Sequence, residues 1–596
     1  MGEHYTSDAN ILKTIGPLFL DELKREFRRG RADATVLRNL RQRIRDTRLL
    51  DPACGGGNFL VVAYQQLHQL DRQIVQRLRS LSHTTSGNHS PAMQVHQCGG
   101  VEINLWPAQV AAAALQVAHH QANRAWELAF GTAHDSSPLP VKTIVVGNAL
   151  RLCWSQVFPP SPDVVVVGNP PFVGQYTKSP EQTADLRHVW GGAYSGYLDY
   201  VSGWFAKAAE YFTGASGGRF GFVATNSIAH GRAVPDLFGP LFSAGWRLRF
   251  AHQTFAWTSE TNHEAGVHCV VVGFDRHETS SPRLFTYPHP KADPVEAQVT
   301  NINAYLVEGP NLFITPRTTP LSPQLPQVTK GSQPTDQGHL LLDSDDYERV
   351  VNDPRVGKYV RIFIGAKELI HNRHRWCLWL EDLDAADLEA SAFLQQRLEA
   401  VREFREGSAK SATRNAASTP HLFTERRQPR LPYVCIPSHF SETRPFPTVS
   451  LFEPGVIAGN ANFTAADSDG YLFGIVSSSM FLAWQKTVGG RLESRLRFSN
   501  TIVWNNLPLP QTSARLRQRI IQAGHRVIDA RGASPELSLA QLYEPSSMTP
   551  KLIRAHTALD HVVDQAFGAT KPLSNDAERQ ALLFHQYERL MSKSNV

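Results

Sequence analysis

A strand made of valines ends abruptly in an Asn-Pro-Pro-aromatic sequence. Asp163-Val-Val-Val-Val-Gly168 runs directly into Asn169-Pro170-Pro171-Phe172. A run of valines is typical of a strand that is buried on both faces of a parallel sheet, and the prolines cannot continue its hydrogen bonding. We therefore expect the polar and aromatic groups from Asn169 to Phe172 at the end of a central strand, where open α/β sheets bind their ligands.

Short β-branched segments alternate with longer helical patterns from Leu49 to about Phe285. This alternation is typical of an α/β fold, a mostly parallel sheet with helices on both faces. The strands are expected at residues 48–52, 98–103, 143–147, 163–168, 219–225 and 267–274. A polar stretch at 80–94 is expected to be a loop insertion in this domain.

A chain of 596 residues is too long for a single hydrophobic core. Residues 1–48 have a basic, helical pattern, and residues 49–300 hold the alternating strands and helices. Residues 301–340 include a stretch rich in proline and threonine, and we expect them to form an irregular linker. Short strands, aromatics and arginines without alternation predict an α+β domain at 341–512, and residues 513–596 return to helical periodicity.

The turn after the first expected strand is rich in glycine and starts with an acid, Asp51-Pro-Ala-Cys-Gly-Gly-Gly-Asn58. Glycine lets the backbone approach a ligand closely, and the helix that follows points its positive end toward that ligand. The Gly-x-Gly-x-x-Gly rhythm of a dinucleotide fold is missing. The acid and the glycine run fit the methionine portion of S-adenosylmethionine better, with Asp51 taking its amino group through water.

Two further strand ends carry polar side chains suited to the rest of such a cofactor. Glu102 ends the second strand, where an acid can hold a ribose diol. The interval from the glycine turn to Glu102 exceeds the roughly 20 residues of a compact nucleotide fold, and the insertion at 80–94 accounts for most of the excess. Asn148 follows the third strand, where it would meet the adenine edge, although an ordinary turn residue is the alternative.

The Asn-Pro-Pro-Phe segment has the groups needed to hold a planar amine. The side-chain oxygen of Asn169 and the carbonyl of Pro170 can accept both hydrogens of an amino nitrogen, which aims its lone pair at a methyl group. Phe172 offers a stacking face; the alternative is a β-turn with an aromatic plug. A base in duplex DNA would have to rotate out of the stack to reach this site. Trp257 could cover its second face or could equally be a core residue.

The order of these motifs resembles the gamma-group adenine-specific DNA methyltransferases. Several segments are also similar to the methyltransferase and target-recognition domains of MmeI-like (type IIG/IIL) restriction–modification enzymes. The segments are His4-Tyr-Thr-Ser-Asp-Ala-Asn-Ile-Leu, Gly147-Asn-Ala-Leu-Arg151, Phe363-Ile-Gly-Ala-Lys-Glu-Leu-Ile-His-Asn-Arg, Trp376-Cys-Leu-Trp-Leu and Gly490-Arg-Leu-Glu-Ser-Arg-Leu-Arg-Phe-Ser.

This resemblance implies a Rossmann-like class I S-adenosylmethionine-dependent methyltransferase domain, a C-terminal α+β target-recognition domain and a helical C-terminal segment. It implies that Asn169, Pro170 and Phe172 hold the N6 amine of a target adenine in a specific duplex sequence. The expected cofactor-binding residues are Tyr5, Thr6, Asp51, Ala53, Gly55, Asn58, Glu102 and Asn148.

The chain also departs from the family pattern. MmeI-like enzymes usually carry an N-terminal nuclease and a helical connector before the Tyr-Thr-Ser segment, and this sequence starts at that segment. We find neither an Asp…Glu-x-Lys strand pattern nor a phosphate-binding Gly-x-x-x-x-Gly-Lys-Ser/Thr loop. The expectation is therefore modification without cleavage by this polypeptide, and a separate restriction or defence subunit stays open as a partner.

Double-stranded DNA as a partner requires cations for the phosphates and forked side chains for the base edges. Arg491, Arg495 and Arg497 are the cluster most expected on the DNA backbone, and the net charge of +6 is compatible with a polyanion. Alternatives are a partner-dependent or non-catalytic DNA-recognition subunit, or an amine methyltransferase that acts on RNA or protein glutamine.

The remaining sequence features concern compartment and metals. No apolar run approaches the roughly 18 residues of a membrane span, and the N-terminus lacks a signal pattern, so we expect a cytoplasmic protein. The 6 cysteines have no paired spacing, so neither a metal site nor a disulfide framework is indicated.

Overall fold

The computed structural model describes residues 6–82, 90–131, 143–259, 262–276, 281–492 and 494–594. The chain divides into two compact units, Met1–Phe313 and Ile314–Val596. Tyr5, one of the expected cofactor-binding residues, lies outside the described residues.

The first unit is built on a sheet of order β3-β2-β1-β4-β5-β7-β6-β8-β9. Its strands from β3 to β5 are parallel, whereas β7 runs antiparallel to both β5 and β6. The strands are β1 (Arg48–Asp51), β2 (Cys98–Glu102), β3 (Ile144–Val146), β4 (Val164–Gly168), β5 (Arg219–Thr225), β6 (Arg247–Ser259), β7 (Asn262–Asp275), β8 (Arg283–Thr286) and β9 (Val295–Gln298). The strand order reverses between β1 and β4, so this is the switch point where α/β sheets bind ligands.

The strands expected from the sequence are present, which confirms the α/β fold. Additional strands β6, β8 and β9 extend the sheet beyond the prediction. The pairing of β6 with β7 includes register shifts between Leu248 and Phe250 and between His252 and Phe255. Such bulges interrupt the period-2 alternation by which strands are detected in a sequence.

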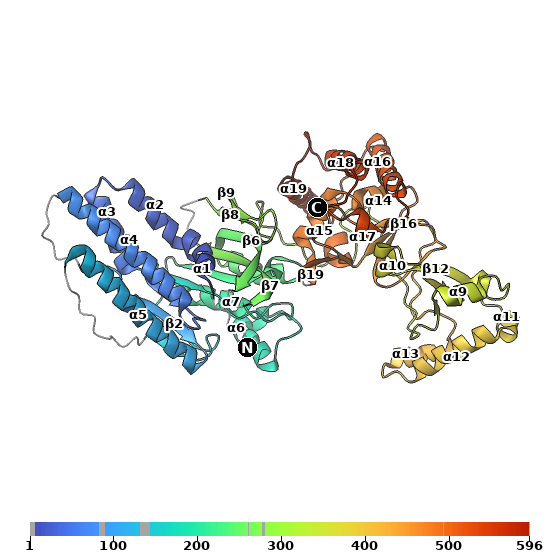
Figure 1. Cartoon of the computed structure of the whole chain (residues 1–596), viewed down its shortest axis with the longest axis horizontal. Coiled ribbons are helices and arrows are strands. Elements are labelled where there is room, and N and C mark those ends of the chain that lie inside the picture. The colour runs from blue at the N-terminus through green and yellow to red at the C-terminus, as the bar shows by residue number, and fades with distance from the viewer. Residues whose placement is uncertain are drawn as a thin grey trace. The chain divides into compact units, whose positions relative to one another are not determined.

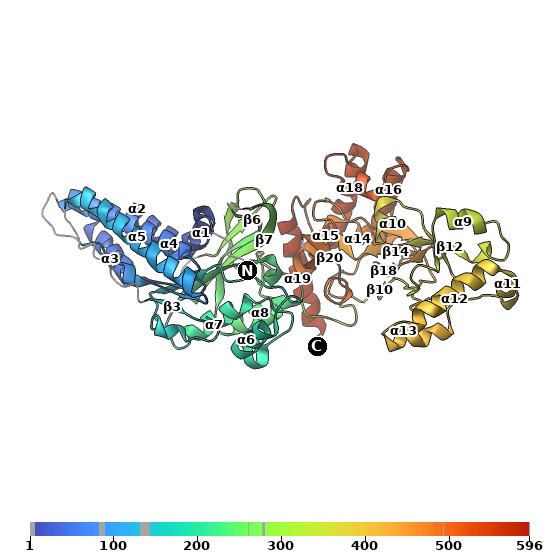
Figure 2. The same cartoon turned by 60° about the horizontal axis from the view of Figure 1, so that its bottom comes forward.

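One face of this sheet is covered by helices α1 (Asp8–Ile15), α2 (Asp21–Arg29), α3 (Ala34–Asp46), α4 (Asn58–Ser82) and α5 (Leu105–Phe130). Side chains from β1, β4 and β5, such as Leu49, Val167 and Val223, share one buried core with residues of these helices. Helices α4 and α5 run side by side (Figures 1 and 2). The N-terminal helices therefore pack as part of the core of the first unit.

The opposite face carries α6 (Pro180–Trp190), α7 (Ser202–Tyr211) and α8 (Ala233–Ser243) (Figure 2). Its core is aromatic: Phe205 of α7 packs edge-on against Phe222 of β5 at 5.2 Å, and Phe220 stacks on Phe274 at 4.7 Å. Edge-to-face and offset stacking are the favoured geometries for such rings. This layer places α6 and α7 beside the carboxyl end of β4.

The second unit is mixed α and β, as the sequence pattern predicts. Its small sheets have the orders β10-β18-β14-β16, β11-β13-β12-β17 and β15-β20-β19. The strands are β10 (Thr329–Lys330), β11 (Leu341–Leu342), β12 (Val360–Ile364), β13 (Trp376–Leu378), β14 (Tyr433–Pro437), β15 (His439–Phe440), β16 (Ser450–Phe452), β17 (Ile457–Ala458), β18 (Asn462–Ala466), β19 (Gly490–Leu492) and β20 (Arg495–Arg497). The helices are α9 (Ser344–Val350), α10 (Ala366–His371), α11 (Ala385–Ala390), α12 (Ala392–Glu406), α13 (Ser411–Asn415), α14 (Tyr471–Val476), α15 (Ser479–Val488), α16 (Ala514–Gly532), α17 (Leu539–Leu542), α18 (Pro550–Ala566) and α19 (Asp576–Ser594).

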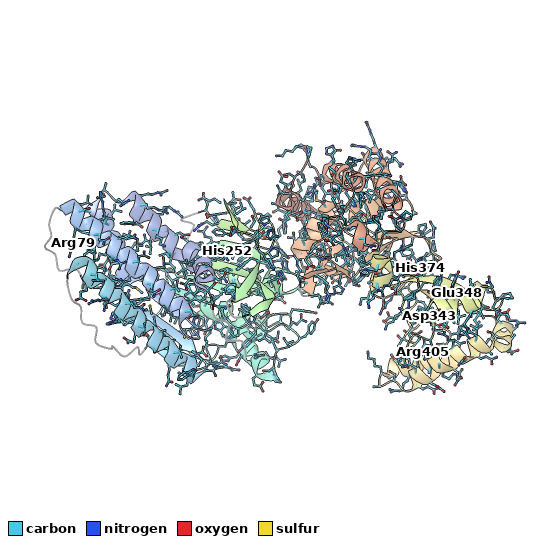
Figure 3. The ribbon with its side chains drawn as sticks, viewed as in Figure 1. Arg79, His252, Asp343, Glu348, His374 and Arg405 are labelled. Atoms are coloured by element: carbon cyan, nitrogen blue, oxygen red, sulfur yellow. The ribbon has the colours of Figure 1, made fainter. Side chains whose placement is uncertain are left out.

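A buried arginine organises the loops around α12 in this unit. Arg405, labelled in Figure 3, has 0% exposure near the end of α12. Its guanidinium donates to five backbone carbonyls, at 2.8–3.0 Å, of Pro334, Thr335, Ala416, Thr419 and Leu422. All five N–H donors of the side chain are therefore used. This contact gives part of the expected linker, at 334–335, a fixed place in the second unit.

The C-terminal helices brace α15. Asp560 of α18 accepts hydrogen bonds from the backbone and hydroxyl of Ser479 at 2.7 and 2.6 Å. Asp564 of the same helix forms a bidentate pair with Arg579 of α19, at 3.0 and 2.9 Å. These contacts show that the C-terminal helices support the preceding domain.

Candidate active site

Asp51 ends β1 at the switch point and is almost fully buried, with 1% exposure. Its Oδ1 accepts a hydrogen bond from the Ala53 N–H at 3.0 Å. Burial raises the pKa of Asp51 to about 7; the hydrogen bond from Ala53 opposes this shift, and the nearby charge of Glu102 contributes to it. A cation held beside this carboxylate would offset the cost of its ionisation.

The glycine turn leaves open space beside its backbone. Gly55 has a φ of +52°, a left-handed conformation that favours glycine, and a Cβ added there would meet nothing within 4 Å. Asn58 begins α4 directly after this turn. The turn therefore presents backbone and a helix N-terminus to an open volume, as expected for a ligand-binding loop.

Glu102 ties the second strand to this turn. Its Oε2 accepts from the Gly55 N–H at 3.1 Å and its Oε1 from the Asn104 N–H at 2.9 Å. A carboxylate oxygen has more than one lone pair, so both oxygens can still accept from a diol. The apolar side chains of Ile103 and Trp106, which the sequence analysis did not single out, are 61% and 73% exposed beside it.

Both polar groups of Asn148 are already engaged in the protein. Its Oδ1 accepts from the Leu150 N–H at 2.9 Å, and its Nδ2 donates to Asp185 Oδ2 at 2.9 Å. Asp185 also accepts from Arg151 Nε at 2.7 Å and from the Tyr200 hydroxyl at 2.9 Å. Although burial opposes ionisation, these hydrogen bonds lower the pKa of Asp185. Asn148 therefore has the contacts of an ordinary turn residue, which was the alternative interpretation of the sequence. Its contact with the adenine edge of the cofactor stays a prediction.

Asn169 follows β4 directly and carries an unused buried acceptor. Its Nδ2 donates to Thr6 Oγ1 at 3.3 Å, whereas its Oδ1 is buried without a hydrogen-bond partner in the described part of the chain. Leaving a buried oxygen unpaired costs roughly 1–3 kcal/mol, so an N–H from a ligand would be favourable here. Pro170 is buried. Phe172 is partly buried and packs against the core between the sheet and helices α1 to α5.

The structure thus gathers Thr6, Asp51, Gly55, Glu102 and Asn169 around the ends of β1, β2 and β4. Ala53 belongs to the same turn, and Asn58 begins the helix that follows it. Trp257 lies in β6 with 6% exposure, and its ring centroid is 5.9 Å from that of Phe255 in the core. Trp257 is therefore a core residue, and its stacking on a target base stays a prediction. Asp185, Asp199 and Tyr200, which the sequence did not mark, also belong to this region.

The arginine cluster of the second unit lies on the hairpin of β19 and β20. Arg495 and Arg497 are exposed on β20, while Leu496 between them is buried, as expected from the alternation of side chains along a strand. Arg491 on β19 is more enclosed: its guanidinium donates to the Lys486 carbonyl at 3.3 Å, and burial lowers its pKa to about 10. The hairpin therefore presents two of the three predicted cations to solvent.

Among the described residues, no group of three or more His, Cys, Asp or Glu side chains is arranged to hold a metal ion. In the same part of the chain, every helix is too short or too polar to cross a membrane.

The sheet order, the acid–glycine turn and the polar loop after β4 define a class I methyltransferase domain. Comparison with known families gives a more specific assignment. The model for the MmeI DNA-methyltransferase domain matches residues 27–286, that for the MmeI target recognition domain matches residues 308–511, and that for the MmeI C-terminal domain matches residues 512–594.

Individual relatives agree over the full length of the chain. DNA methyltransferase A of Bacillus subtilis (strain 168) is 34% identical over 602 residues, which cover 100% of this chain and 67% of that protein. The solved structure of the Type IIL restriction–modification enzyme MmeI in complex with DNA is 37% identical, with a TM-score of 0.81, covering 99% of this chain and 79% of that one. The chain belongs to the MmeI family and carries its DNA-methyltransferase, target recognition and C-terminal domains.

Proposed function

We propose that this protein transfers a methyl group from S-adenosylmethionine to the N6 amine of an adenine in a specific duplex DNA sequence. The observation that carries the proposal is the buried Oδ1 of Asn169 at the switch point, beside the acid–glycine turn; this oxygen has no hydrogen-bond partner among the residues that the structure describes. An amino group is the partner that such an acceptor lacks.

The residues around the turn fit S-adenosylmethionine. The buried Asp51, with its raised pKa, suits the cofactor's ammonium group, directly or through water. Glu102 retains lone pairs for a ribose diol, and exposed Ile103 offers an apolar face beside it. The open space beside Gly55 would receive the methionine portion. Ala53 in the turn and Asn58 at the start of α4 would line this space, and Thr6 would cover it. When bound, the cofactor supplies an electrophilic methyl group on a sulfonium centre.

The amine site works by orientation. The Asn169 Oδ1 and the Pro170 carbonyl would accept the two hydrogens of the adenine amine, which shifts the nitrogen lone pair out of the ring and toward the methyl group. Phe172 would stack on the base, and Trp257 is the candidate for its other face. Because the proton leaves after attack, no strong base is needed at this position.

A duplex substrate fits the rest of the chain. An adenine in a duplex reaches this site only when it is extruded from the stack, and the match to a solved MmeI–DNA complex supports a DNA substrate. The target recognition domain would then read the base edges, with Arg495 and Arg497 on the phosphates. Arg491 is the third arginine that we propose for contact with the DNA backbone. A DNA substrate suits a cytoplasmic protein that acts in restriction–modification or phage defence.

Modification-sensitive long-read sequencing tests the proposal directly. The chain and its Asn169→Ala variant would be expressed in a methylation-free host, and cofactor binding by both would be measured by calorimetry. We expect one sequence motif methylated at adenine with the wild-type chain, no methylation with Asn169→Ala, and similar cofactor affinity for both proteins.

Other outcomes identify the alternatives. Loss of cofactor binding in Asn169→Ala would show that the amine site is misplaced. A soluble wild-type protein that binds cofactor and leaves the DNA unmodified would contradict the proposal. Radiolabelled methyl transfer to RNA, to protein glutamine, or to DNA in the presence of a separate restriction or defence subunit would then distinguish the remaining possibilities.

A further inference from the structure

Both backbone polar groups of Val173, which follows the Asn-Pro-Pro-Phe segment, are hydrogen-bonded. The Val173 N–H donates to Asp199 Oδ1 at 3.2 Å, and the Val173 carbonyl accepts from the Tyr200 N–H at 3.0 Å. Asp199 and Tyr200 lie just before α7 in the chain, with the N-cap residue Val201 between them and the helix. The loop that carries Phe172 is thereby fixed to one two-residue segment, which we call the 199–200 clamp.

Asp199 connects this loop to the neighbouring strand. It is buried, with 7% exposure, and its Oδ1 also accepts from the Val201 N–H at 3.2 Å. Its Oδ2 accepts from the hydroxyls of Thr225, at the end of β5, and Ser227, at 3.3 and 3.4 Å. A single carboxylate therefore joins the amine loop, the start of α7 and the carboxyl end of β5.

Tyr200 connects the same loop to the cofactor side. Its hydroxyl donates to Asp185 Oδ2 at 2.9 Å, and Asp185 accepts there from Asn148 as well. The Tyr200 ring lies edge-on to Trp204, with ring centroids 5.3 Å apart, and Trp204 Nε1 donates to the Pro52 carbonyl at 3.0 Å. The clamp is thus linked to the turn after β3 through the side chain of Asp185 in α6, and to the acid–glycine turn through the ring of Trp204.

We infer that Asp199 and Tyr200 are positioning residues for methyl transfer: Asp199 fixes the amine loop, and Tyr200 aligns that loop with the cofactor turns. This inference rests on the amine and cofactor sites proposed above. Neither side chain is expected to touch the reacting atoms. Their effect is geometric, and a displacement of about 1 Å in a reacting group can lower a rate on the order of 100-fold.

The first test removes the Asp199 carboxylate. Asp199→Ala leaves the N–H groups of Val173 and Val201 without their acceptor. We expect kcat to fall about 10- to 100-fold while the KM for cofactor stays within about twofold. Hydrogen–deuterium exchange should accelerate at the backbone amides of residues 172–176. Asp163→Ala, which removes an exposed aspartate just before β4, is the matched control and should change neither quantity.

A conservative variant separates positioning from general damage. In Asp199→Asn the amide oxygen can still accept from the backbone N–H groups, and its NH₂ can donate to the hydroxyl oxygens of Thr225 and Ser227. We expect this variant to recover most of the lost kcat and the slow exchange of the loop. Failure of Asp199→Asn to recover either quantity would overturn the positioning role.

Tyr200→Phe tests the connection to the cofactor side. It removes the bond to Asp185 and keeps the backbone bond to Val173, so we expect a rise of about 3- to 10-fold in the cofactor Kd with a small change in kcat. Tyr176→Phe, at a residue that is 82% exposed, is the control. An unchanged cofactor Kd in Tyr200→Phe would overturn this half of the inference.

These measurements distinguish failure of the clamp from failure of the proposed function. If the wild-type protein modifies no adenine in DNA, the proposed function is wrong, yet loop exchange in Asp199→Ala and cofactor binding in Tyr200→Phe still decide the inference. Unchanged exchange in Asp199→Ala, or faster exchange with unchanged kcat in an active enzyme, would overturn it.

Discussion

The carboxylate of Asp51 lies directly against Gly168: a Cβ added to Gly168 would be 2.7 Å from Asp51 Oδ1. Real Cβ atoms do not approach an oxygen that closely. Gly168 is the last residue of β4 and immediately precedes Asn169. The last residue of β4 must therefore be small, because a larger side chain would displace the Asp51 carboxylate at the end of β1.

Gly168→Ala should weaken cofactor binding because the new methyl group displaces the Asp51 carboxylate. We expect the cofactor Kd, measured by calorimetry, to rise at least about tenfold, since overpacking a buried site typically costs about 1–3 kcal/mol. Gly192→Ala is the control, because a Cβ at Gly192 would meet nothing within 4 Å. Equal affinity in the Gly168→Ala and wild-type proteins would contradict a role for Asp51 in the cofactor site.

Cofactor affinity should depend on pH through Asp51. Burial raises the pKa of this carboxyl group to about 7 in the free protein, and the cofactor's ammonium group would favour the ionised form. Binding at lower pH must therefore release a proton, so the Kd should increase up to about tenfold per pH unit as the pH falls below about 7. Calorimetric titrations of the wild type between about pH 5.5 and about pH 7 measure this slope. Asp51→Asn should bind more weakly with little pH dependence, and the same slope in both proteins would assign the titration to another group.

The Thr6 hydroxyl should orient the Asn169 amide. Thr6 Oγ1 accepts from Asn169 Nδ2 at 3.3 Å, which leaves the amide oxygen to receive the substrate. Thr6→Val keeps the shape and removes this acceptor, so the single-turnover rate of methyl transfer should fall about tenfold, whereas Thr6→Ser should retain most of it. Because Thr6 is also proposed to cover the cofactor, rates are compared at saturating cofactor. A Thr6→Val enzyme as fast as Thr6→Ser would show that the contact does not orient the amide.

Arg495 should contribute to DNA binding through phosphate contact. Arg495→Ala should reduce the slope of log K against log salt by about 0.9, and Arg495→Glu should weaken binding further, with little change in cofactor affinity. Fluorescence anisotropy with duplex DNA at several salt concentrations measures the slope. Arg124→Glu, at an exposed arginine of α5, is the control. Unchanged retention of the Arg495→Glu protein on DNA would remove this residue from the interface.

Arg405 should be essential to the stability of the second unit. Arg405→Met removes every donor from the five carbonyls that the guanidinium binds, and the free energy of unfolding should fall by about 3 kcal/mol or more. Arg402→Met lies on the same helix at an exposed ion pair with Glu399 and should change stability by less than about 1 kcal/mol. Chemical denaturation followed by tryptophan fluorescence compares the variants. Equal midpoints for both would mean that the carbonyls find other donors.

The family, the α/β core and the motifs at the strand ends could be predicted from the sequence because each depends on contiguous residues. The valine strand, the proline pair after it and the glycine turn specify local backbone structure whatever surrounds them. The strands β6, β8 and β9 were not predicted. In β6 and β7, bulges break the alternation, and β8 and β9 are only four residues long.

The sequence by itself determined which chemical groups stand at the ends of β1, β2 and β4, since a strand fixes where its own last residue lies. Only the tertiary structure decided which of these groups are free to act. Thr6 and Asn169 are 163 residues apart in the chain, and their hydrogen bond engages the amide nitrogen, so that the amide oxygen is the group proposed to meet the substrate. Asp199, Tyr200 and Asp185 acquire their partners in the same way, through contacts between segments that no local pattern connects. The physical reason is that hydrogen bonding and burial depend on the three-dimensional surroundings of a side chain, which distant parts of the chain supply.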